Sequence, residues 1–141
     1  MNDAYTSALF DVVKDTSVKY GYDLPEPIEA YVVMLLATHV DKPDFLPKDA
    51  FGTTLLQLKT GAEAKKLGDT CLFVAGVFPT IGERKGLKRR YYQDIGSTSY
   101  EMASDMNIDL FPVLARHFVF LSNFIEVITH STKYKQNSLF R

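Results

Sequence analysis

The chain has 141 residues, of which 46% are hydrophobic and 23% are charged, and its formal net charge is −1. This length suits one domain with its own core, and this composition excludes an intrinsically disordered chain. The near-neutral charge gives no overall bias toward nucleic acid, and a single cysteine, Cys71, excludes an internal disulfide or a cysteine-based zinc site.

Hydrophobic residues recur at spacings of three and four along almost the whole chain, which is the period of an amphipathic helix. The first helix begins at Asp3 and ends near Gly21, and Pro25 prevents its continuation. The second begins near Pro27, and its apolar stripe runs through Ile28, Tyr31, Val32, Leu35, Leu36 and His39. A proline-rich connection around residues 41–50 leads into a short helix over about residues 48–59.

Two further helices are predicted over about residues 62–78 and 87–106. Gly68, Gly76 and Gly96 lie inside them, and each costs ~1 kcal/mol relative to alanine in a helix. Such glycines predict faces where two helices approach closely. The alternative is a break at Gly68, with Asp69 capping a shorter helix over 70–78. We favour either structural interpretation of Gly68, Asp69 and Thr70 over a ligand site.

The last helix has two adjoining apolar stripes. One contains Phe111, Leu114, Phe118, Leu121, Ile125 and Ile128, and the other contains Leu110, Val113, Phe120, Phe124 and Val127. A helix this apolar is buried on more than one side. We expect residues 108–130 at the centre of the bundle or, if peripheral, joining a second copy in a homodimer.

No segment alternates with the period of a β-strand. The sequence therefore predicts an all-α protein, a single-domain bundle of five or six helices over residues 1–134, with a frayed polar tail at 135–141. The N-terminal segment MNDAYTSALFDVVKD lacks the basic region of a secretory signal, and the longest apolar stretches have about eight residues, whereas a membrane span needs ~20. We expect a soluble cytoplasmic protein that binds no membrane.

No catalytic motif is present, neither a Gly-x-Ser-x-Gly nor a P-loop nor a His-Glu-x-x-His. His117 and His130 lie thirteen positions apart on one predicted helix, ~140° apart around its axis, and His39 is remote in sequence. Glu126 and His130 fit a surface pair at a spacing of four. The sequence predicts that the protein is not an enzyme and holds no metal or cofactor.

Charge is distributed unevenly. Residues 1–60 contain five lysines and nine acidic residues, whereas residues 61–90 contain seven basic and three acidic residues. The basic excess is concentrated in Arg84, Lys85, Lys88, Arg89 and Arg90, followed by Tyr91 and Tyr92. Basic residues beside aromatic rings are typical of binding to a nucleic-acid backbone. A turn between helices is polar in any case, and the acidic N-terminal segment offers internal partners.

The segments LGDTCLFVAGVFP and RRYYQDIGSTSYEMA, within residues 67–103, resemble a family of uncharacterised bacterial helical proteins with the pattern Gly-Asp-x-x-Leu-Phe, Phe-Pro and Tyr-Tyr-x-x-x-Gly-x-x-x-Tyr. The resemblance implies a bacterial helical domain without known activity. It marks Gly68, Asp69, Leu72, Phe73, Gly76, Tyr91, Tyr92, Gly96 and Tyr100. As a packing signature, it implies helices crossing at the glycines and tyrosine hydroxyls bonded to Asp69.

The function that we predict is that of a non-catalytic bacterial binding or adaptor protein. Its partner is an acidic protein surface, and the binding residues are Arg84, Lys85, Lys88, Arg89, Arg90 and Tyr92. One alternative is a nucleic-acid-binding regulator that uses the same segment. The other is a small-molecule sensor with an apolar pocket among the phenylalanine-rich helices.

Overall fold

The structure, a computed structural model, describes residues 3–39 and 51–132. These residues form seven α-helices, five of them 14 residues or longer, and no strand. In chain order they are α1 (Asp3–Tyr20), α2 (Glu26–His39), α3 (Phe51–Leu56), α4 (Gly61–Val77), α5 (Arg89–Met102), α6 (Phe111–Arg116) and α7 (Phe118–Thr132), with 3-10 turns η1 (Glu83–Lys85) and η2 (Ser104–Met106). The predicted all-α bundle is confirmed, while residues 40–50 and the tail 135–141 lie outside the described residues.

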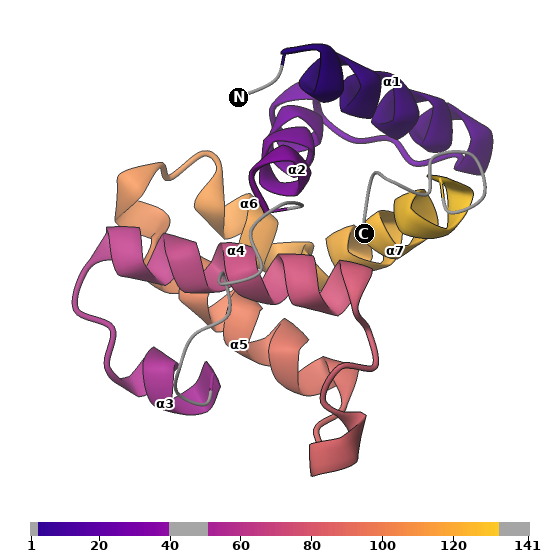
Figure 1. Ribbon diagram of the computed structural model, residues 1–141. Coiled ribbons are helices and arrows are strands. Elements are labelled where there is room, and N and C mark those ends of the chain that lie inside the picture. Colours follow the sequence, from indigo (N-terminus) through magenta and orange to yellow (C-terminus); the bar gives the residue numbers. More distant parts are fainter. Residues whose placement is uncertain (1–2, 40–50, 133–141) are drawn as a thin grey trace.

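Helix α4 lies at the centre of the bundle (Figure 1). It runs between α2 and α7 on one side and α3 and α5 on the other. Eleven of its 17 residues are buried. The helix begins with a capping box, in which the Thr60 hydroxyl accepts from the Glu63 N–H and the Glu63 carboxylate accepts from the Thr60 N–H. Most other elements therefore pack around this one well-capped helix.

The prediction that residues 108–130 form one central helix is wrong. The segment divides at His117, whose backbone (φ −104°, ψ 20°) ends α6. Helix α7 then packs beside α4 and is covered by α1 and α5 as well. The change of direction brings the Phe118 ring into the core against Gly96. The apolar circumference of this segment therefore reflects burial between several neighbours rather than a central position.

Three interior glycines lie where the central helices cross. At each one, an added Cβ would stand within 2.5 Å of a side chain on a neighbouring helix: Gly68 against Tyr100, Gly76 against Ile125, and Gly96 against Phe118. Helix backbones approach this closely only where no Cβ intervenes. The predicted close approach is observed, and α4 continues unbroken through Gly68, so a separate helix over 70–78 is wrong.

The second apolar stripe of the last helix is largely covered within the chain. Phe124 is fully buried, Leu110 and Val113 are partly buried, and the Tyr22 ring contacts Phe120 and Phe124 edge-on at centroid distances of 5.1 and 4.8 Å. The expected homodimer depended on this stripe being uncovered. It stays a prediction, and the covered stripe no longer supports it.

Candidate functional site

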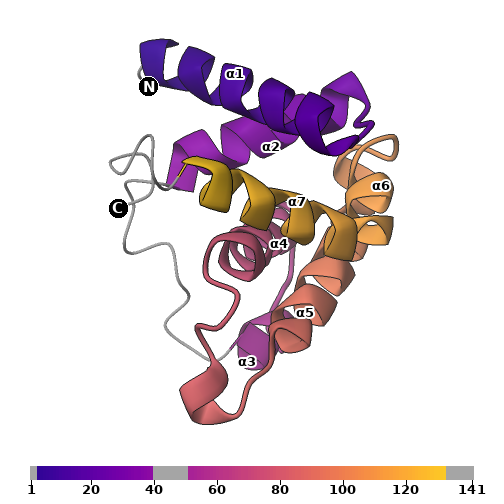
Figure 2. The same cartoon turned by 90° about the vertical axis from the view of Figure 1, so that its right-hand side faces the viewer.

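The turn between α4 and α5 projects from the bundle. It spans residues 78–88 and lies at the opposite end of the molecule from α1 and α2 (Figure 2). Gly86 takes the left-handed conformation (φ 75°), and the Leu87 N–H donates to the Gly82 carbonyl at 2.9 Å. The turn is therefore closed by its own backbone hydrogen bonds and presents its side chains from a defined loop.

Tyr92 packs against this turn from inside the protein. It is buried, at 6% exposure, and its hydroxyl occupies the space that a Cβ on Gly82 would need. Its ring contacts Phe51 edge-on at 5.1 Å. Burial raises the pKa of its hydroxyl. The neighbouring Tyr91 hydroxyl accepts from the Gly52 N–H at 3.0 Å. Tyr92 was expected to contact a partner, but the structure places it inside the protein, where it packs against the turn.

Three basic side chains of the turn are exposed and form no ion pair with the part of the chain that the structure describes. Arg84, Lys85 and Lys88 have no acidic side chain of the described residues within ion-pair distance. Arg90 is exposed and lies 3.6 Å from Asp94, an arrangement that contributes little to stability. Pairing between these cations and the acids of α1 and α2 is not observed, so their charge faces solvent.

Arg89 points the other way, into the bundle. Its Nε donates to the Ala75 carbonyl at 2.8 Å, and its Nη2 donates to the Ser122 carbonyl at 3.1 Å. Its Nη1 lies 3.0 Å from the Glu126 carboxylate. A cation is favoured at the carbonyl end of a helix, and here Arg89 joins the end of α4 to α7. Arg89 was expected in the binding surface, but it is occupied within the protein.

Arg89→Gln should lower the free energy of unfolding by about 2 kcal/mol, because two buried carbonyls lose a charged donor and Glu126 loses its partner. Urea denaturation measures this loss. Arg90→Gln, one position further along the chain, is the matched control and should change stability by less than about 0.5 kcal/mol. Equal effects of the two substitutions would contradict the assignment.

Two apolar side chains flank the exposed cations. Phe78 and Ile81 are 42% and 45% exposed, and the Ile81 N–H donates to the Phe78 carbonyl, so both belong to the same turn. The helix predicted over residues 62–78 included Phe78, and no role was predicted for Ile81. Their exposure beside Arg84 and Lys85 appears only once the end of α4 and the course of the turn are known.

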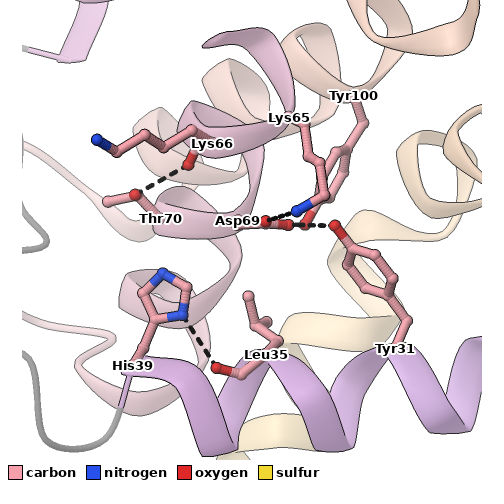
Figure 3. Close-up of polar contacts among 8 residues, drawn as sticks. All are labelled: Tyr31, Leu35, His39, Lys65, Lys66, Asp69, Thr70 and Tyr100. Carbon is pink, nitrogen blue, oxygen red and sulfur yellow. Dashed lines mark hydrogen bonds and ion pairs between the residues drawn. The ribbon is translucent and has the colours of Figure 1, made fainter. Parts of the chain in front are cut away.

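A second polar cluster surrounds Asp69 between α2, α4 and α5 (Figure 3). The Asp69 Oδ1 accepts from the hydroxyls of Tyr31 at 2.5 Å and Tyr100 at 2.7 Å, and its Oδ2 pairs with the Lys65 Nζ at 2.8 Å. Asp69 is buried and Tyr100 is completely buried. Both carboxylate oxygens of Asp69 thus have hydrogen-bond donors, as a buried charge requires.

The hydroxyl groups of the Asp69 cluster are hydrogen-bond donors that hold three helices together. Burial, followed by the charge of Asp69, raises the pKa values of Tyr31 and Tyr100 above the ordinary value of tyrosine. Both hydroxyls therefore stay protonated near neutral pH and donate to the carboxylate. Burial also raises the pKa of the Cys71 thiol, which disfavours the nucleophilic thiolate. Of the three tyrosines that the packing signature marked, Tyr100 bonds to Asp69, whereas the hydroxyls of Tyr91 and Tyr92 lie at Gly52 and Gly82. The contribution of Tyr31 was missed.

The histidines do not assemble a metal centre in the part of the chain that the structure describes. His39 stacks on Phe73 at 5.4 Å, and its Nδ1 lies 3.0 Å from the Leu35 carbonyl. His117 is exposed at the α6–α7 break. No three His, Cys, Asp or Glu side chains among these residues are grouped to bind a cation.

None of the described helices has the length and apolar composition that crossing a bilayer requires.

Comparison with known proteins identifies no relative: no family model, no curated protein and no solved structure matches the chain. The resemblance of residues 67–103 to a bacterial family therefore stays a prediction.

Proposed function

We propose that this protein is a non-catalytic binding or adaptor protein of the bacterial cytoplasm, whose α4–α5 turn engages an acidic protein partner. The observation that carries the proposal is the exposure of Arg84, Lys85 and Lys88 on a closed, projecting turn, without an acidic partner among the described residues. Exposed cations left unpaired contribute little to stability but attract an oppositely charged surface.

The apolar pair beside the cations favours a protein partner. Charged residues at the rim of an interface set the rate and specificity of association, while buried apolar side chains supply much of the affinity. Phe78 and Ile81 are exposed on the same turn and would serve as such anchors. The nucleic-acid alternative relied on Tyr91 and Tyr92 as rings for base stacking. Tyr92 is buried and the hydroxyl of Tyr91 is bound to α3, so these tyrosines do not support the nucleic-acid alternative.

The test measures how a peptide and an oligonucleotide, two polyanions, bind to the wild type and to a charge-reversal variant. The triple variant Arg84→Glu/Lys85→Glu/Lys88→Glu is titrated with a fluorescent peptide of alternating glutamate and leucine, and with a single-stranded oligonucleotide. The wild type should bind the peptide, more weakly as salt is raised from 50 to 200 mM because the attraction is screened. The variant should lose at least about tenfold in affinity and keep its thermal midpoint.

The control variant reverses three exposed basic residues outside the turn, Lys59, Lys66 and Arg116, at the same change of net charge. It should bind the peptide within about twofold of the wild type if position matters more than total charge. Equal losses in both variants, or no peptide binding at 50 mM salt, would refute the proposal. Tighter binding of the oligonucleotide than of the peptide would favour the nucleic-acid-binding regulator instead.

A further inference from the structure

The α1–α2 connection and the α6–α7 break lie on the side of the bundle away from the basic turn (Figure 2). Residues of both connections line a recess. Its volume is about 350 Å³. Leu24 and Ile28 form one wall, and Val113 and Leu121 form the other. Small-molecule sites are typically apolar hollows of ~300–1,000 Å³, so this recess is large enough for a single ring with a short side chain.

The recess exists because two helix ends face each other across it. On one side the chain leaves α1 at Gly21 and enters α2 only at Glu26. On the other side α6 ends at Arg116 and α7 begins in a new direction at Phe118. Two of the lining side chains, Ile28 and Leu121, belong to the core, so the buried part of the recess is apolar.

The polar groups of the recess select the charge of a ligand. Asp23 lines it, is exposed, and forms no hydrogen bond or ion pair with the described residues. Among the described residues that line the recess, His117 is the other polar side chain, and none is a lysine or an arginine. Phe120, held edge-on by Tyr22, also lines the recess and remains 40% exposed. A carboxylate beside an aromatic ring favours a cation, through charge and through the face of the ring.

We propose that this recess binds a small molecule with an apolar body and a protonated amine, of the arylalkylamine class. The apolar body occupies the space between Ile28 and Val113, and the ammonium group donates to the Asp23 carboxylate at the mouth. The inference is independent of the basic turn, because the turn attracts anions and lies at another end of the molecule. A ligand here would join α1–α2 to α6–α7.

The experiment compares three ligands of one shape and different charge. Phenethylamine, 2-phenylethanol and 3-phenylpropionate are titrated into the isotopically labelled full chain, and binding is followed by amide chemical shifts. Phenethylamine should bind about tenfold more tightly than the alcohol, the factor expected of one partly exposed charge-assisted hydrogen bond. The carboxylate should bind most weakly. The shifted amides should lie in residues 21–28 and 113–121.

Two substitutions test the two halves of the site. Asp23→Asn keeps the shape and should reduce phenethylamine affinity about tenfold, to that of the alcohol. Val113→Phe fills the recess and should abolish binding of both. Asp11→Asn, which removes an exposed carboxylate from α1 outside the recess, should leave affinity unchanged. The proposal fails if phenethylamine shifts no recess amide at millimolar concentration, if the carboxylate binds as well as the amine, or if Asp11→Asn matches Asp23→Asn.

Discussion

Gly96→Ala should lower the free energy of unfolding by about 3 kcal/mol, although alanine favours a helix by ~1 kcal/mol over glycine. An added Cβ on Gly96 would overlap the ring of Phe118 and stand 2.7 Å from the Cβ of Cys71. Phe118 opens α7, and Cys71 lies in the middle of α4, so the methyl group would be forced into the meeting point of three helices. None of the three can move without disturbing the other two.

The measurement is equilibrium denaturation in urea, with the slope compared as well as the midpoint. Gly52→Ala is the matched control, because Gly52 is also helical and an added Cβ would meet only the Tyr91 hydroxyl, at an ordinary 3.4 Å. It should change stability by less than about 1 kcal/mol. A Gly96→Ala protein as stable as the wild type would show that α5 and α7 can separate without cost.

Much of this fold follows from local patterns in the sequence. The predicted helix over 62–78 matches α4 to within one residue at each end, because a capping box begins it and Pro79 follows it. The interior glycines predicted close helix crossings, since a glycine that costs helix stability is retained where a Cβ has no room. Such features depend on a residue and its near neighbours in the chain, which the sequence contains.

The sequence could not show which basic residues of the turn are available. Arg89 and Arg90 are adjacent, yet one reaches the carbonyl end of α4 and the other reaches solvent. The difference depends on where α4 and α7 end relative to the first turn of α5, and that is a tertiary relation. Apolar periodicity likewise predicted helix in 108–130 but not its division at His117, since the stripes continue across the break.

Tyr31 shows the same limit at the Asp69 cluster. Its place in the apolar stripe of α2 predicted that it faces the core, which is so in part, because its ring packs against Tyr100 and Phe111. Its hydroxyl partner lies 38 positions away in the chain. The signal in the sequence was an aspartate, Asp69, within a largely apolar helix. A carboxylate buried in such a helix requires donors from neighbouring helices.

Asp69→Ala should destabilise the protein by about 3 kcal/mol. The substitution removes the acceptor that two tyrosine hydroxyls share, and one of them, that of Tyr100, is completely buried. Tyr100→Phe removes one donor while Tyr31 and Lys65 remain, so it should cost only about 1 kcal/mol. The double variant, Asp69→Ala with Tyr100→Phe, has no buried Tyr100 hydroxyl that lacks its Asp69 acceptor. Its loss of stability should therefore be smaller than the sum of the two single losses by about 1 kcal/mol.

The exposed Asp94 is the control for Asp69, and Asp94→Ala should change stability by less than about 0.5 kcal/mol. The cluster also has an alkaline signature. Because the pKa of Tyr100 is raised in the folded state, the unfolded chain releases this proton first, so the contribution of Tyr100 to stability should be intact below pH 10.0 and fall above it. The fall should be shallower in Tyr100→Phe. Additive losses in the double variant, together with identical alkaline profiles, would show that Asp69 and Tyr100 do not act as a unit.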